Sequence, residues 1–225
     1  GFKVTVPSFR GDLRQNVDLI EEIARIIGYD RLQVSFPHIQ VLNIAPNARP
    51  RQLRRQISDV LLSNGYDETV TFSLISHKDL KASNLSHLPV IEMHNALSAE
   101  HCLLRPSMMP SLLHVAATNF NRGQKDLRLF ELGKRYFLNG ERSTLGILAA
   151  GKKNVQWQSN SKERVNFFDV KGILEQIRVG AEVQFEAGNY AGLEDYSAAV
   201  IKLDGKIIGA AGKVEKKVLA IANYL

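Results

Sequence analysis

The sequence has one cysteine in 225 residues, and it has no long apolar run. The single thiol, Cys102, excludes an internal disulfide and fits a reducing compartment. No stretch approaches the roughly 20 consecutive apolar residues that a membrane-spanning helix requires, and no signal peptide opens the chain. We therefore expect a cytoplasmic protein without a membrane partner.

Familiar catalytic motifs are missing as well. The sequence contains no G-x-S-x-G, no P-loop and no G-x-G-x-x-G, and no His or Cys pair has the spacing of a zinc site. Residues 2–6 begin like a strand entered part-way, and the last residues lack a polar tail, so we expect a piece of a longer polypeptide. The residues alone predict no catalytic and no cofactor-binding constellation.

The overall composition is that of a globular protein. Hydrophobic residues make up 44% of the chain and charged residues 23%, which is enough apolar material for one large or two smaller domains. Lys and Arg outnumber Asp and Glu by 29 to 23, giving a net charge of +6. This balance permits a polyanionic partner such as nucleic acid but does not require one.

The hydrophobic pattern predicts an α+β fold. Hairpins are expected around Asn139-Gly140 and Asp204-Gly205, because each dipeptide separates two apolar runs. A helix capped by Asp169 is expected between the hairpins. Strands joined by hairpins, with helices between the pairs, indicate an antiparallel sheet flanked by helices.

The first half of the chain is predicted to alternate helices with short strands. Alternating apolar residues predict strands at 2–6 and 69–74, and helices are expected after Pro50 and Pro110. Ser76 followed by Asp79 resembles a capping box. The proline-containing stretch after residue 33 has no helical period, so a domain boundary is expected there.

Four carboxylates gather at the start of a predicted helix in "GDLRQNVDLIEEIARIIGYD", which ends at Gly28. Asp18 as N-cap, Glu21 at N3 and a Glu21–Arg25 pair would explain two of them structurally. Asp12 and Glu22 are left over. Glu22 shares a helix face with Asp18, and four such oxygen donors would suit Mg²⁺ or Ca²⁺. An acidic, well-capped helix start is the alternative.

Arginines gather at another helix start, in "NARPRQLRR". One interpretation is contact with phosphates. The other is a solvated or subunit-facing helix surface, which we favour. The residues concerned are Arg49, Arg51, Arg54 and Arg55.

Several stretches, taken in order, resemble the β chain of bacterial phenylalanyl-tRNA synthetase. They are "VPSFRGDLRQNVDLIEEIARIIGYDRL", "VLLSNGYDETVTFSLIS", "NALSAEHCLLRPSMMPSLL", "LRLFELGKRYF" and "NFFDVKGILEQI". Ala96 stands where the family usually has Pro and Ser111 where it usually has Gly, and we expect both to change local turns. The resemblance implies a winged-helix-like C-terminal part at 1–36, a linker at 37–50 and a class II synthetase-like module at 51–225.

The resemblance also implies a division of labour. The family enzyme is an (αβ)₂ tetramer that uses ATP to join phenylalanine to its tRNA, with the active site in the α chain. Class II sites grip phosphates with arginines after the motif-2 strand and near the motif-3 strand. Here no Arg directly follows Tyr136-Phe137, and the last glycine-rich stretch is followed by lysines. We therefore expect an inactive, structural chain that does not itself bind ATP, pairs with α and a second αβ unit, and meets tRNA through the full complex.

The family also places a Mg²⁺ in the β chain, shared with α, with the ligand pattern Asp-x₅-Asp-x₂-Glu-Glu. Asp12, Asp18, Glu21 and Glu22 match that pattern without gaps. Four carboxylates exceed the charge of one divalent ion, so basic groups or water from α are expected to help.

Two other functions remain open at this point. The basic balance and the arginines permit a nucleic-acid-binding regulatory module without a ligase role. A metal-dependent hydrolase built on the four carboxylates is the weaker alternative, because no general base or nucleophile accompanies them.

Overall fold

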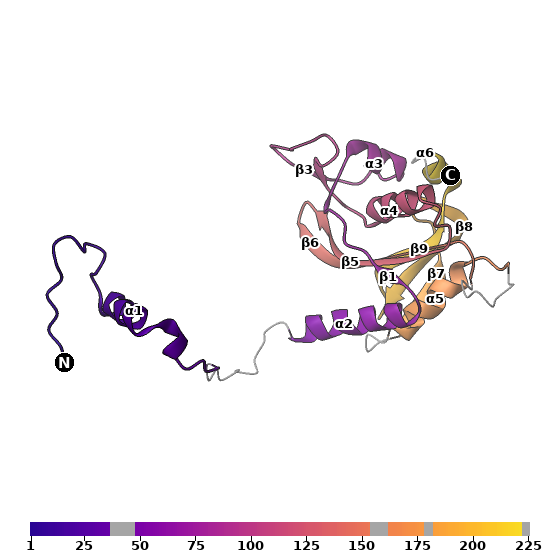
Figure 1. Ribbon diagram of the computed structural model, residues 1–225. Helices are drawn as coiled ribbons and strands as arrows, with labels where there is room; N and C mark the ends of the chain where they lie inside the picture. The colour runs from indigo at the N-terminus through magenta and orange to yellow at the C-terminus, as the bar shows by residue number, and fades with distance from the viewer. Residues whose placement is uncertain (37–47, 154–161, 178–181, 222–225) are drawn as a thin grey trace. The chain divides into compact units, whose positions relative to one another are not determined.

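A computed structural model describes residues 1–36, 48–153, 162–177 and 182–221, and the chain divides into two compact units (Figure 1). The first unit is Gly1–Pro46 and the second is Asn47–Leu225. Most of the predicted linker, residues 37–47, lies outside the described residues. Residues 48–50, which were predicted to end the linker, already belong to helix α2 (Ala48–Ser63).

The first unit contains helix α1 (Asn16–Ile27) and the short 3₁₀ helix η1 (Tyr29–Arg31). Gly28 ends α1 as predicted: its φ is 95°, and its N–H donates to the Ala24 carbonyl at 2.9 Å. The predicted strand at 2–6 is wrong. Within the described residues no second strand pairs with it, and Phe2 is fully exposed. An alternating pattern forms a strand only where a neighbour takes up its backbone hydrogen bonds.

The second unit is α+β, as predicted. Its further helices are α3 (His77–Ala82), α4 (Met109–Asn121), α5 (Phe167–Gln176) and α6 (Lys216–Ile221). Its strands are β1 (Asp67–Glu68), β2 (Leu74–Ile75), β3 (Ile91–Glu92), β4 (Leu103–Leu104), β5 (Leu127–Phe137), β6 (Gly140–Ala150), β7 (Val183–Ala187), β8 (Leu193–Leu203) and β9 (Lys206–Val214). The described strands form sheets in the orders β1-β5-β6, β2-β4-β3 and β7-β8-β9, in which every pairing is antiparallel except the parallel β1–β5 pair.

Both predicted hairpins are present, but only one turns where the sequence indicated. Asp204 and Gly205 have φ of 49° and 71° and join β8 to β9, as a type I′ turn requires. In the other hairpin Gly140 pairs with Phe137, so the loop is Leu138-Asn139 and lies one residue earlier than predicted. Gly140 instead takes up a positive φ at the first position of β6.

The β5–β6 hairpin has a hydrophobic core on each face. On one face Phe130, fully buried, packs with Leu61 of α2 and Ile173 of α5. On the other face Leu129 packs with Ala116 of α4. Figure 1 shows α4 on the opposite side of this hairpin from α2 and α5. Apolar residues therefore occupy consecutive positions of β5, because helices cover both faces of the hairpin.

Residues 69–74 are oriented against the usual burial rule. Val70 and Phe72 are 91% and 74% exposed, whereas the hydroxyl of Thr71 points inward and bonds to buried groups. Only the end of this segment is assigned as a strand, in β2. Residues 69–74 turn a polar side chain inward because the buried groups that this segment covers are themselves polar.

A buried polar network centres on Arg105, which is 1% exposed. Its Nη2 donates to Glu131 Oε1 at 2.7 Å, its Nη1 to Thr71 Oγ1 at 2.7 Å, and its Nε to the Lys134 carbonyl at 2.9 Å. The Thr71 hydroxyl donates in turn to Glu131 Oε2 at 2.7 Å. Ser111 was expected to alter a turn, but it lies in α4 and its hydroxyl accepts a bond from Nη1 at 3.3 Å. The charges of the pair are thus compensated and hydrogen-bonded.

Candidate metal centre

Asp18, the second predicted metal ligand, caps the first turn of α1 from inside the helix. The helix begins at Asn16 with Gln15 as N-cap, so Asp18 lies at N3 rather than at the N-cap as predicted. Its Oδ2 accepts the backbone N–H groups of Gln15 at 2.7 Å and Arg14 at 2.8 Å. These two bonds, with the Gln15 bond the larger cause, lower the pKa of Asp18. One oxygen of Asp18 is therefore committed to the helix start.

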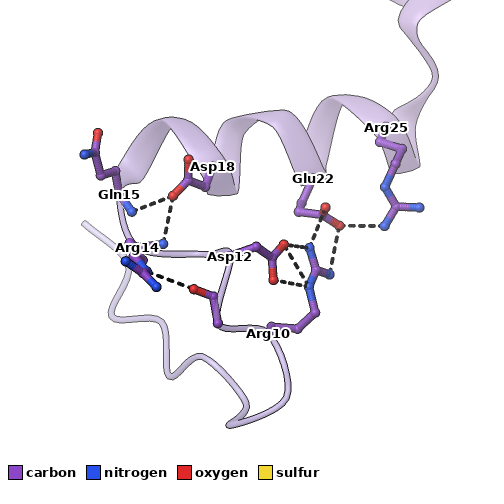
Figure 2. A network of polar contacts seen from close by, with 8 residues as sticks. Arg10, Asp12, Arg14, Gln15, Asp18, Glu22 and Arg25 are labelled. Carbon is purple, nitrogen blue, oxygen red and sulfur yellow. Dashed lines mark hydrogen bonds and ion pairs between the residues drawn. The ribbon is translucent and has the colours of Figure 1, made fainter.

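Asp12 and Glu22 are brought together by Arg10, as Figure 2 shows. The guanidinium Nη2 lies 2.7 Å from Asp12 Oδ2 and 2.8 Å from Glu22 Oε1. The Nε atom lies 3.0 Å from Asp12 Oδ1. The loop before α1 thus folds back on the helix, but a cation of the chain itself lies between the two carboxylates.

Glu22 has a second arginine partner. Arg25 Nη2 lies 2.5 Å from Glu22 Oε2, an i, i+3 pair on α1. The predicted Glu21–Arg25 pair is therefore wrong. Glu21 is exposed, and within the described residues it has no hydrogen bond or ion pair. Adjacent helical residues point about 100° apart, since 3.6 residues make one turn, and Glu22 rather than Glu21 lies on the face that Arg10 reaches.

The two arginines fix the charge state of this cluster. Hydrogen bonds from Arg10, and secondarily from Arg25, lower the pKa of Glu22 to about 2. The Arg10 hydrogen bonds also lower the pKa of Asp12, and the pKa of Arg10 itself is raised. Carboxylates are ionised at neutral pH in any case, and these hydrogen bonds keep Asp12 and Glu22 ionised to lower pH than usual.

The four predicted ligands do not form one metal-binding set in this arrangement. Two of them share Arg10, Asp18 caps the helix, and Glu21 lies apart. Among the described residues, no group of three or more His, Cys, Asp or Glu side chains is arranged to hold a metal ion. Ligation of Mg²⁺ by Asp12, Asp18, Glu21 and Glu22 therefore stays a prediction, and the geometry does not fit it without rearrangement.

The sequence interpretation missed Arg10. Basic groups or water from the α chain were expected to meet the excess negative charge, whereas Arg10 and Arg25 supply positive charge from within the chain. The available indication was the arginine two residues before Asp12. Sequence spacing alone does not show that this side chain also reaches Glu22, twelve residues away.

The arginines at the start of α2 are exposed, and two of them have acidic neighbours. Arg54 lies 3.6 Å from Glu68, and Arg55 lies 4.0 Å from Asp59. Exposed pairs of this kind contribute little to stability. Phosphate contact and a subunit-facing surface both remain predictions for this helix start.

Comparison with known proteins gives a consistent result along the chain. A family model described as "Phenylalanyl tRNA synthetase beta chain CLM domain" matches residues 32–223, and one described as "tRNA synthetase B5 domain" matches residues 1–29.

None of the helices in the described part of the chain is long and apolar enough to span a membrane.

Two curated relatives are phenylalanine–tRNA ligase beta subunits. The protein of Thermotoga maritima is 34% identical over 224 residues, which are 97% of this chain and 28% of that protein. The protein of Staphylococcus haemolyticus is 33% identical over 226 residues, with 96% and 28% covered. The chain thus spans about 28% of the length of these relatives.

A solved structure has the same fold. A pyrrolysyl tRNA synthetase of Desulfitobacterium hafniense superposes with a TM-score of 0.58 at 14% identity, over 78% of this chain and 62% of that chain. The predicted α+β fold of the class II synthetase type is confirmed by this likeness.

Proposed function

Because the chain belongs to the phenylalanyl-tRNA synthetase beta chain family, we propose that it is part of the β subunit of a phenylalanine–tRNA ligase, an enzyme of the cytoplasm. The observation that carries this proposal is the family match over residues 32–223, together with relatives 34% and 33% identical along nearly the whole chain. The complete enzyme would use ATP to attach phenylalanine to its tRNA. In this proposal the adenylate forms in an α subunit, and this chain is its structural partner.

The positions of the arginines support a non-catalytic role. Arg105, the arginine of the "LLRPS" stretch, is buried against Glu131 and is not accessible to a phosphate. Leu138 rather than an arginine follows β5. Arg135 and Arg142 do lie on the β5–β6 hairpin, but both guanidinium groups lie over the ring of Phe137, at 5.0 and 5.5 Å. Phosphate binding needs guanidinium N–H groups that are free to donate to the phosphate oxygens.

A surface of the second unit supports the partner-binding part of the proposal. Val70 and Phe72 expose apolar side chains, and the Phe72 ring contacts the His101 ring at 5.2 Å between centroids. Leu97 is also fully exposed. Apolar side chains that stay exposed while polar neighbours are buried are typical of surfaces that another chain covers.

Adenylate chemistry is tested directly by ATP–pyrophosphate exchange in the presence of phenylalanine. We expect no exchange with this chain alone. We expect exchange when a cognate α chain is added to the full protein that contains this chain. Clear exchange without α would refute the structural role. Phenylalanylation of tRNA by the complex then tests the ligase assignment.

Partner binding is tested by Phe72→Ser, measured by titration against the α chain. We expect at least tenfold weaker association, with an unchanged circular dichroism spectrum because the side chain is exposed. Tyr196→Ser is the matched control, since Tyr196 is likewise exposed but lies on β8. Equal affinity of the wild-type chain and Phe72→Ser would exclude the Phe72 side chain from the interface.

The regulatory alternative makes a different prediction. A nucleic-acid-binding module would bind duplex DNA with a steep dependence on salt, weakened by removal of the α2 arginines. The regulatory alternative would be favoured if the chain bound DNA tightly and in a salt-dependent way and if no ATP–pyrophosphate exchange appeared in the presence of α.

A further inference from the structure

The Arg10 guanidinium occupies the space that a cation shared by Asp12 and Glu22 would need. It contacts both oxygens of Asp12, at 3.0 and 2.7 Å, and both oxygens of Glu22, at 3.4 and 2.8 Å. The second Glu22 oxygen also receives Arg25 at 2.5 Å. Every oxygen of the two carboxylates therefore already has a guanidinium partner.

A divalent ion would compete for the same oxygens. Mg²⁺ requires a near-octahedral set of oxygens at about 2.0–2.1 Å and tolerates little distortion. Asp12 and Glu22 carry two negative charges, which Arg10 and Arg25 balance. Placing Mg²⁺ beside an unmoved Arg10 would bring like charges together, which disfavours both.

We propose that Arg10 and a divalent cation exclude each other at the Asp12–Glu22 pair. Arg10 acts as the cation of the chain itself: it holds the loop before α1 against the helix in the absence of metal. Direct ligation of Mg²⁺ by this pair requires the guanidinium to move out first. This inference does not depend on the proposed ligase function, since it concerns only the cation preference of the chain.

Solvent access makes such an exchange feasible. The side chains of Arg10, Asp12 and Glu22 are 30%, 59% and 23% exposed, so neither a guanidinium leaving nor a hydrated ion entering must cross a packed core. The loop also has a second attachment to α1, because the Arg14 N–H donates to Asp18 Oδ2 at 2.8 Å. Moving Arg10 therefore does not release the whole loop.

The test is calorimetric titration of the chain with MgCl₂, comparing wild type with Arg10→Gln and Arg10→Lys. We expect Arg10→Gln to bind Mg²⁺ at least tenfold more tightly than wild type, and Arg10→Lys to lie between them because lysine cannot bridge two carboxylates as a fork. Arg31→Gln is the matched control: it removes one exposed positive charge from the same unit but neither guanidinium that contacts Asp12 and Glu22, so its affinity should stay within about threefold of wild type.

Folding is followed in parallel by circular dichroism. If Arg10→Gln loses helix without metal, recovery of that helix on adding MgCl₂, but not KCl, supports the proposal. If the helix of Arg10→Gln does not recover, the Mg²⁺ affinity of Arg10→Lys tests the proposal instead. Mg²⁺ affinities that are equal in wild type and in the folded Arg10 variants overturn the proposal, whatever the outcome of the α-chain experiments.

Discussion

Arg105 and Glu131 form an ion pair in the interior of the second unit, 2.7 Å from Nη2 to Oε1, with side-chain exposures of 1% and 5%. Their remaining hydrogen-bonding groups are met by Thr71, Ser111 and the Lys134 carbonyl. The pair ties the segment before β2 to β5 and the residues before α4.

Removing one member of the pair should strongly destabilise the second unit. Glu131→Gln leaves a buried guanidinium without its counter-charge, and breaking such a pair costs about 3–5 kcal/mol. Urea unfolding of the chain measures the change. Glu141→Gln is the control, because the Lys134–Glu141 pair is about half exposed and should change stability by less than about 1 kcal/mol. Similar losses in both variants would contradict the assigned importance of burial.

Gly133 should not tolerate a methyl group. A Cβ there would lie 2.3 Å from Arg105 Nη2 and 2.9 Å from Glu131 Oε1, and the network holds both groups in place. We expect Gly133→Ala to cost about 1–3 kcal/mol. In the helical control Gly172→Ala, where a Cβ meets nothing within 4 Å, stability should rise by about 0.5–1 kcal/mol. If Gly133→Ala left the stability unchanged, the Arg105 side chain would have to shift freely to make room for the methyl group.

The inverted orientation of residues 69–74 predicts an inverted mutational pattern. Thr71→Val removes a hydroxyl that links two buried charges, and hydrogen bonds to charged groups contribute about 1.5–3 kcal/mol. Phe72→Ser removes a large apolar group that is 74% exposed, so stability should change by less than about 0.5 kcal/mol. Thermal unfolding of the two variants checks the order. A greater loss in Phe72→Ser would contradict this orientation.

Acid should remove a contribution of Asp169. Burial alone would raise the pKa of Asp169, but the Lys153 side chain and the Asn166 N–H together lower it below its ordinary value of 3.8. A depressed folded-state pKa stabilises the fold above the ordinary value, and the contribution is lost as the pH falls through the folded-state pKa. The stability gap between wild type and Asp169→Asn should therefore be larger at pH 7 than at pH 2.

Urea unfolding at the two pH values measures that gap. Other carboxylates titrate in both proteins and cancel in the comparison. Glu175→Gln is the control, because it alters an i, i+4 pair with Lys171 in which Glu175 is about half exposed, and such a pair contributes little to stability. A gap for Asp169→Asn that is the same at pH 7 and pH 2 would contradict the stated cause.

Features decided over a few residues were predictable from the sequence. Ser76 and Asp79 form the predicted capping box, Gly28 ends α1, and Asp204-Gly205 turns between β8 and β9. Each depends on backbone geometry that a residue carries with it: a hydroxyl beside free N–H groups, or a conformation that favours glycine. The α+β fold followed from the order of such elements.

Even local chemistry left one ambiguity. Asp18 and Asp169 were both predicted as N-caps, and both lie at N3, from which the carboxylate reaches back to the N-cap N–H. An acidic residue suits both positions, because both neutralise free amides and favour the helix dipole. Which residue becomes the N-cap depends on the residues that precede the helix.

Tertiary structure alone decided which side of residues 69–74 is buried, because the buried Arg105 and Glu131 come from distant parts of the chain. It also decided the fate of the carboxylates at the start of α1. The sequence determined that four of them would lie near one helix start. Only the fold placed Arg10 between Asp12 and Glu22 and left Glu21 in solvent, because a side chain's partner is set by distance in space.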